Sequence, residues 1–154
     1  MAFQTAESGR NSGEWGKRAA RLVARAVGAE MSPTGGKSQR SNLCTFHQRP
    51  AAIKMAGRGT TKFLIYKSVL AKTELMIFAH QVDNNNKFEI YQIESARIPH
   101  ITRKASHKRH TDTALVISLS LVRTYGTLIA NKRLPAVTLR KVPPRKPGKR
   151  RQRA

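Results

Sequence analysis

The chain has 154 residues, and its 30 Lys plus Arg against 8 Asp plus Glu give a formal net charge of +22. The length indicates one domain, and a hydrophobic fraction of 39% is enough for a modest core, which excludes wholesale disorder. No stretch approaches the ~18 consecutive apolar residues of a membrane-spanning helix, and the N-terminus lacks the apolar segment of a secretory signal. The single cysteine, Cys44, excludes an internal disulfide framework and a Cys-rich metal site. We therefore expect a soluble protein without a membrane span, in the cytoplasm or nucleoid.

The positive charge is concentrated in clusters. Residues 131–154 hold ten Lys or Arg and no acid, and residues 97–110 hold five Lys or Arg, three His and no acid. Because acids are absent nearby, internal salt bridges cannot neutralise most of this charge, and a polyanionic partner is expected. The phosphate backbone of a nucleic acid is such a partner. The alternatives are an anionic membrane surface and a merely solvated basic surface.

The N-terminal region predicts a flexible segment followed by a helix. Residues 1–12 are small and polar, whereas over 14–27 the apolar residues recur at helical spacing and most of the Lys and Arg fall on the other side. Ser12 is a candidate N-cap and Gly28 a candidate C-terminal stop. The basic side can contact phosphates or be the solvated face of a core helix. The Arg- and Ala-rich composition is also typical of an organellar transit peptide, so an organellar matrix is the alternative location.

A Gly-rich loop over 32–41 follows the helix. Its Gly-Lys-Ser sequence at 36–38 lacks the earlier glycine of a phosphate-binding P-loop, because Met31 stands at that position. Nucleoside triphosphate binding is therefore not expected. The sequence then predicts two short strands, 42–47 and 51–56, joined by a hairpin turn.

The middle of the chain predicts the centre of a sheet. Residues 61–70 are apolar and partly β-branched or aromatic, which fits either a strand or a short helix. The run 74–82 is apolar on both faces and is expected to be a central strand. Residues 83–86, one Asp and three Asn, predict a hairpin turn into a partner strand over 87–93. We interpret His80, inside the central strand, as a hydrogen-bonded core histidine rather than a metal ligand.

The last third of the chain alternates basic and apolar segments. Pro99 is expected to end the preceding unit, and 100–112 to be a basic loop. Its three histidines suit phosphate contacts better than zinc, because the surrounding Lys and Arg repel a cation. A strand is predicted over 114–122, followed by a turn and a short partner strand over 127–130.

Together these elements predict an α+β fold, one N-terminal helix packed on a mainly antiparallel β-sheet, with a disordered basic C-terminal tail. The single domain is expected over 13–133, and residues 134–154 have too little apolar surface to pack. Loop residues should contact phosphates, and the tail should add a nonspecific electrostatic arm. Aromatic residues are too few for a single-strand stacking platform. The predicted nucleic-acid contacts are Lys37, Arg40, Arg58, Lys62, Arg103, Lys104, Lys108, Arg109, Arg140, Lys141, Arg145, Lys146, Lys149, Arg150, Arg151 and Arg153.

One layout resembles a nuclease family. Glu14 lies on the predicted helix, Asn42 begins the first strand of the hairpin, and Ala52 and Lys54 lie on its second strand. This order over residues 13–95 resembles the PD-(D/E)XK restriction-endonuclease-like family, in which a helix Glu, a strand Asp and a (D/E)-x-K motif surround Mg²⁺ that activates water against a phosphodiester. The resemblance implies that Glu14 is the helix acid and that Lys54 positions or deprotonates the water. Asn42 and Ala52 replace two of the three carboxylates that hold the metal, which implies a DNA-binding relative with a degraded metal site.

Two further functions stay open. A structural ribosomal or organellar-ribosomal protein fits the composition equally well and would prefer structured RNA, whereas the nuclease-like interpretation predicts duplex DNA. An active Mg-dependent endonuclease requires Glu14 and Lys54 to meet another acid, such as Glu74 or Glu89. Mg²⁺ is expected as a cofactor only in that case, and no other metal is expected.

Overall fold

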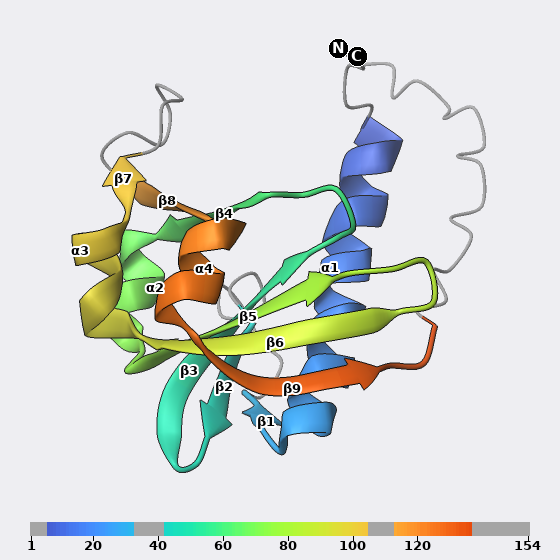
Figure 1. Ribbon diagram of the computed structural model, residues 1–154, viewed down its shortest axis with the longest axis horizontal. Helices are drawn as coiled ribbons and strands as arrows, with labels where there is room; N and C mark the ends of the chain where they lie inside the picture. The colour runs from blue at the N-terminus through green and yellow to red at the C-terminus, as the bar shows by residue number, and fades with distance from the viewer. Residues whose placement is uncertain (1–5, 33–41, 105–112, 137–154) are drawn as a thin grey trace, which may run out of the picture.

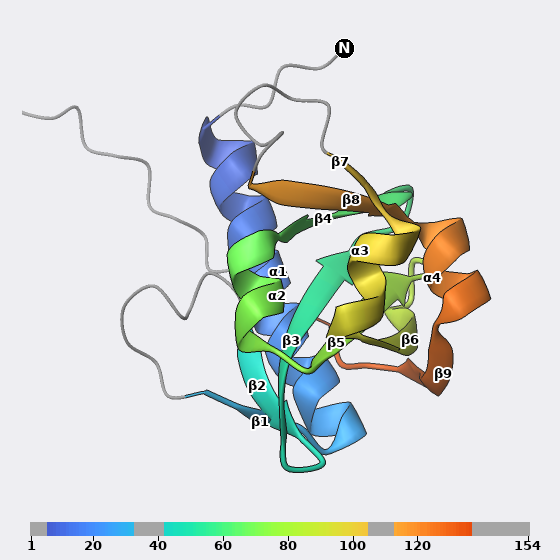
Figure 2. The ribbon, with the colours of Figure 1, turned by 90° about the vertical axis from the view of Figure 1, so that its left-hand side faces the viewer.

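The computed structural model describes residues 6–32, 42–104 and 113–136, and it describes the side chains of these residues except 6–14, 103 and 104 (Figure 1). It has three layers: a long helix, a six-stranded sheet, and a layer made of a three-stranded sheet with short helices (Figure 2). All strand pairs but one are antiparallel. The α+β fold with one N-terminal helix on a mainly antiparallel sheet is confirmed, and the short helices and the parallel pair add to it.

The two sheets have the orders β1-β2-β3-β5-β6-β9 and β4-β8-β7. The strands are β1 (Glu30–Met31), β2 (Leu43–Phe46), β3 (Arg49–Ala56), β4 (Lys62–Tyr66), β5 (Leu75–Gln81), β6 (Lys87–Glu94), β7 (Arg103–Lys104), β8 (Ala114–Ser118) and β9 (Thr127–Arg133). The helices are α1 (Ala6–Val27), α2 (Lys67–Lys72), the 3-10 turn η2 (Ser95–Arg97), α3 (Ile98–Ile101) and α4 (Leu119–Tyr125). None of the helices in the described ranges is long and apolar enough to cross a bilayer.

Side-chain alternation along the strands divides the core into two clusters, one on each face of the six-stranded sheet. On one face, Ile53 and Ile77 pack with Val23 of α1. On the other face, Phe78 packs with Ile117 of the second sheet and with residues of α2 and α4. The sheet is therefore covered on both sides, which explains why its central strand is apolar throughout.

Strand β5 is that central strand. Its residues 75–80 are all buried. It pairs antiparallel with β6 and parallel with β3, and the parallel pair needs a crossover, which β4 and α2 supply. The prediction of a central strand over 74–82 with an antiparallel partner over 87–93 is confirmed.

Both predicted hairpin turns are present. The β2–β3 turn has positive φ at His47 and Gln48 and lies slightly earlier than expected, so that Pro50 belongs to β3. In the β5–β6 turn, Asn86 has φ 57°, and the carboxylate of Asp83 accepts two backbone N–H groups at 2.9 and 3.0 Å. These bonds replace ladder bonds within the turn and fix the register of the two strands.

Helix α1 differs from prediction at its start and agrees at its end. It begins at Ala6, so Ser12 is an interior residue and not the N-cap. The weak helix formers near this end lower helix propensity by at most about 1 kcal/mol each, which does not stop a helix whose later turns pack on the sheet. At the other end Gly28 has φ 77°, and the N–H of Ala29 donates to the carbonyl of Ala24 at 2.8 Å. This is the Schellman arrangement, and it confirms Gly28 as the stop.

Two apolar segments change from strand to helix part-way. The segment 61–70 contains both of its expected alternatives, β4 and then α2. The strand predicted over 114–122 ends at Ser118, whose hydroxyl accepts the N–H of Leu121 at 3.2 Å and caps α4. Leu119 and Val122 are both buried at a helical spacing of three, so the apolar run fits a helix there as well as a strand.

The C-terminal part is folded further than expected. Pro99 lies in the first turn of α3 instead of ending the unit, which its fixed φ permits. The remainder of the expected basic loop, 105–112, lies outside the described residues. Strand β9 extends beyond the predicted 127–130, and Leu134 is buried and donates its N–H to the carbonyl of Asn86 at 2.8 Å. The expected tail from residue 137 onward also lies outside the described residues.

Candidate nucleic-acid interface

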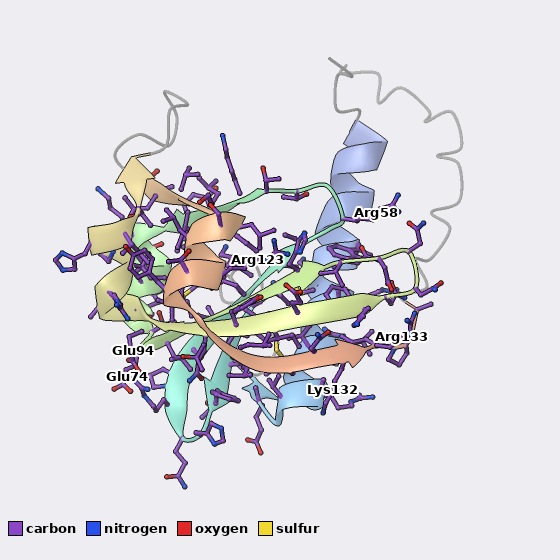
Figure 3. All side chains as sticks on the ribbon, viewed as in Figure 1. Arg58, Glu74, Glu94, Arg123, Lys132 and Arg133 are labelled. Atoms are coloured by element: carbon purple, nitrogen blue, oxygen red, sulfur yellow. The ribbon has the colours of Figure 1, made fainter. Side chains whose placement is uncertain are left out.

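The structure places only part of the predicted contact set. Arg58 is exposed in the connection between β3 and β4 (Figure 3), and Lys62 is exposed at the start of β4. Arg103 and Lys104 form β7, and their side chains are not described. The other predicted contacts lie outside the described ranges: Lys37, Arg40, Lys108, Arg109, Arg140, Lys141, Arg145, Lys146, Lys149, Arg150, Arg151 and Arg153.

Lys62 borders a cavity. The cavity has a volume of about 330 Å³, and its lining combines the Lys62 stem with apolar side chains of α3, α4 and β8. Ser118, the register partner of Lys62 on β8, also lines it. Lys62 is therefore an exposed residue at the border of a partly apolar cavity.

The acidic side chains of the described part are largely used within the fold. Arg49 donates to Glu74 at 3.0 Å and, through two nitrogens, to Glu94 at 2.8 and 2.5 Å. These hydrogen bonds raise the pKa of Arg49 and lower that of Glu94. Figure 3 shows Glu74 and Glu94 together at this end of the sheet. One arginine thus ties the start of β3 to Glu74, just before β5, and to Glu94, the last residue of β6.

Two more acids have arginine partners. Arg123 lies 3.2 Å from Glu89, which also accepts the hydroxyl of Tyr91 at 2.9 Å. Arg133 lies 3.5 Å from Asp83. Of the five acids whose side chains are described, which are Glu30, Glu74, Asp83, Glu89 and Glu94, four are therefore paired with three arginines. Most of the remaining Lys and Arg are left without acidic partners inside the described part.

Helix α1 carries the most regular group of these cations. Lys17, Arg21 and Arg25 are all exposed, and their spacing of four residues puts them about 6 Å apart along one side of the helix. None of the three has an acidic partner among the described side chains. We call this set the α1 row. The opposite side of α1, which includes Val23, is buried against the sheet, so the row points away from the core.

A fourth cation lies at the C-terminal end of α1. The ammonium group of Lys132, on β9, donates to the carbonyl of Ala26 at 3.4 Å, in the last turn of α1. A cation there is favoured by the negative end of the helix dipole. The sequence indicates a basic side of the helix, but these residues are not among the predicted contacts. Their four-residue spacing is visible in the sequence. The sequence does not show which acids the fold pairs with other arginines.

The hairpin of the nuclease-like layout is present. Asn42 precedes β2 with φ 48°, its carbonyl accepts the N–H of Ile53 at 3.1 Å, and its side-chain amide lies 3.4 Å from the Ile53 carbonyl. Lys54 is half-buried between Ala52 and Ala56 on the face away from α1, with its ammonium 5.8 Å from the centre of the Tyr66 ring. Burial lowers the pKa of Lys54.

The described residues do not assemble carboxylates around Lys54. Glu14 lies in α1, on the other face of the sheet, and its side chain is not described. Lys54 pairs with Phe78, four residues from Glu74, which is about 13 Å along the strand. Glu89 is held by Arg123. Within the described ranges no group of three His, Cys, Asp or Glu is placed to hold a metal ion, so these side chains do not fit a Mg²⁺ site.

Two other groups with potential chemistry are buried. Cys44 is buried in the core, and desolvation raises the pKa of its thiol to about 11, which makes it an unreactive core residue. His80 is also buried, as predicted, but its Nδ1 has no hydrogen-bond partner. Its role is therefore not that of a fully hydrogen-bonded core histidine.

No known protein family, curated protein or solved structure matches this chain.

Proposed function

We propose that this protein binds nucleic acid through the phosphate backbone, with the α1 row as the main contact surface of the described part. The observation that carries the proposal is the set of Lys17, Arg21 and Arg25, which are exposed, one turn apart and unpaired by any described acid. Like charges at this spacing repel one another on the isolated protein. A polyanion lying along the helix converts that repulsion into attraction.

The arrangement favours nucleic acid over a membrane surface. A helix that binds lipid inserts its apolar face between the headgroups and keeps its basic face toward them. The apolar side of α1 is already buried against the six-stranded sheet, around Ala20, Val23 and Ala24. Only the charged side is available to a partner, which suits a phosphate backbone.

The nucleic acid we propose is duplex DNA, with structured RNA as the alternative. The supporting feature for DNA is the hairpin in which Asn42 faces Ile53 and Lys54 follows, because these residues resemble part of the restriction-type endonuclease layout without its carboxylates. We therefore propose a DNA-binding relative of that family whose metal site is degraded. A structural ribosomal protein would share the electrostatics and differ in its preference for RNA.

The test is a titration of the full chain with matched duplex DNA and structured RNA over a salt series. The logarithm of affinity should fall steeply with the logarithm of salt concentration, as expected for roughly six to ten released counterions. Arg21→Gln/Arg25→Gln should reduce the slope by about 2 units, one for each lost phosphate contact. The matched control is Lys67→Gln/Lys72→Gln, which removes the same charge from exposed positions of α2 on the other face of the sheet.

Three outcomes decide between the alternatives. A flat salt response, or equal effects of the two double variants, contradicts binding along the α1 row. Tighter binding to RNA moves the ribosomal alternative ahead of the DNA-binding one. Cleavage in a parallel Mg²⁺ reaction that Lys54→Ala abolishes would establish an active endonuclease and overturn the degraded-site proposal.

A further inference from the structure

The junction of α4 and β9 holds two of the three exposed large hydrophobic residues of the described part. Tyr125, the last residue of α4, is 40% exposed, and Leu128, in β9, is 50% exposed. Only Tyr66 joins them as an exposed large hydrophobic residue in the described part. Leu119 and Val122 of the same helix are buried, so Tyr125 is the point where the apolar side of α4 leaves the core. Grouped exposed apolar side chains indicate a contact surface more often than isolated ones do.

A cation from a distant segment lies over the exposed ring. The guanidinium carbon of Arg97, at the end of η2, is 5.3 Å from the centre of the Tyr125 ring. Arg97 is exposed and has no acidic partner among the described side chains. The fold thus brings a planar cation and an aromatic ring to the same place on the surface, although 28 positions separate them in the sequence.

The ring is carried by a fixed element. The N–H of Gly126 donates to the Val122 carbonyl at 2.8 Å, which closes the last turn of α4. A Cβ at Gly126 would lie 3.2 Å from Tyr91 Cβ and 3.3 Å from Ile93 Cγ1, so the backbone packs directly on β6. The backbone that carries Tyr125 is therefore held in place, so binding to the ring needs no rearrangement of the chain there.

We propose that Tyr125 and Arg97 form a stacking site for one unpaired nucleobase, with the Arg97 guanidinium also available to the adjoining phosphate. This inference rests on the proposed function, because it names the form of nucleic acid that the protein prefers. Unpaired bases stack on aromatic rings and on guanidinium planes, whereas the bases inside a duplex hide their faces against one another. The preferred ligand is then a nucleic acid with an unpaired segment, such as a loop or a single-stranded extension beside a duplex.

The stacking site is separate from the α1 row. Helices α1 and α4 lie on opposite sides of the six-stranded sheet, as both views show (Figures 1 and 2) and as the two core clusters require. The two surfaces cannot be one continuous footprint on a short duplex. Substitutions at Tyr125 should therefore affect unpaired bases and leave the phosphate contacts of the α1 row intact.

The experiment compares a flush duplex with the same duplex carrying a single-stranded extension, prepared as DNA and as RNA, in binding titrations with the full chain. The extension contains 2-aminopurine, whose fluorescence is quenched when it stacks. Tyr125→Ala should weaken binding to the extended duplex about 10-fold and abolish the quenching, while the flush duplex is bound as before. Tyr125→Phe keeps the ring and should behave like the unchanged chain. Tyr66→Ala, an exposed tyrosine elsewhere, is the matched control.

Two results overturn the site. One is equal binding of both duplexes by the unchanged chain without any fluorescence change. The other is quenching that survives in Tyr125→Ala. In that case phosphate binding to the flush duplex still stands. Failure to bind either duplex at low salt contradicts the proposed function itself. Circular dichroism of Tyr125→Ala excludes unfolding as the cause of a loss, and Arg97→Gln provides a second variant at the same site with an intermediate expected loss.

Discussion

Two groups of cations, one on each face of the six-stranded sheet, are used in opposite ways. On the α1 side, Lys17, Arg21 and Arg25 are exposed and unpaired by any described acid. On the other side Arg123 and Lys54 have partners within the fold: Arg123 has Glu89, and Lys54 has the ring of Tyr66.

This difference separates charge that serves the fold from charge that serves a partner. A cation that is paired internally has already exchanged water for a carboxylate or a ring, so a ligand gains less from it. An unpaired exposed cation keeps its full attraction for phosphate. Removing cations from the α1 row should therefore change binding and not stability. Changing the partnered groups of the other face should change stability first.

Gly126→Ala should have the largest effect on stability. The added Cβ would overlap the carbonyl oxygen of Val122 and press on the side chains of Tyr91 and Ile93, so the end of α4 must move. We expect a loss of about 2 kcal/mol in the free energy of unfolding, typical of overpacking against a rigid backbone. Urea denaturation of the two proteins measures it.

The same variant sharpens the comparison between the faces, because it moves Tyr125 without touching α1. Binding to the flush duplex should stay unchanged, and quenching of the unpaired probe should decrease. An equal loss on both duplexes would indicate that the two faces do not act separately. Gly16→Ala is the matched control, since a Cβ at Gly16 on α1 meets nothing within 4 Å.

Lys54→Met should have a smaller effect and the opposite sign. Burial lowers the folded-state pKa of Lys54 below its ordinary value of 10.5, so the charged amine is disfavoured in the folded state. The resulting loss of stability is absent above pH 10.5, grows as pH falls from 10.5 toward the folded pKa, and is complete below that pKa. At pH 7 Met, with a similar shape and no charge, should raise the free energy of unfolding by about 1 kcal/mol.

Thermal unfolding of Lys54→Met at pH 7 checks this prediction. A lower melting temperature would show that the ring of Tyr66 compensates the buried charge fully. Lys62→Met is the control, because Lys62 is exposed and its replacement should leave stability nearly unchanged.

The sequence predicted most of the fold because its strongest apolar and turn patterns belong to the segments that pack in the core of the sheet. The apolar run 74–82 could only be buried on both faces, and the Asp-Asn turn after it supplied the positive φ at Asn86. The errors lie where two structures fit the same residues. The run 114–122 satisfies strand alternation up to Ser118 and helical spacing beyond it, and only the cap at Ser118 decides the boundary.

The candidate interface was less predictable, because it depends on ion pairs between residues that are far apart in the sequence. Arg49, Arg123 and Arg21 are equivalent in the sequence, and only the fold brings Glu74 and Glu94 to the first and Glu89 to the second. The sequence gives the total excess charge but not which cations remain unpaired. The Tyr125–Arg97 contact likewise joins η2 to α4 across 28 positions, and no local pattern indicates it.

The smallest expected effect is the pH dependence that His80 gives to the free energy of unfolding. His80 is buried opposite Glu89 on β6, and burial lowers its pKa below the ordinary 6.5, with Arg123 lowering it further and Glu89 opposing both. The unfolded state therefore binds a proton before the folded state does, and stability should fall as pH decreases from 6.5 through the folded pKa. Denaturation at pH 7 and pH 5 should show this loss, and His80→Phe should remove it.

Glu94 and Asp83, whose pKa values are lowered in the fold, lose their contributions to stability only at more acidic pH, so they do not interfere between pH 7 and pH 5. An unchanged pH dependence in His80→Phe would mean that the unpaired Nδ1 is solvated in the folded state, and the second face would then hold a hydrated polar site instead of a closed network of partnered groups.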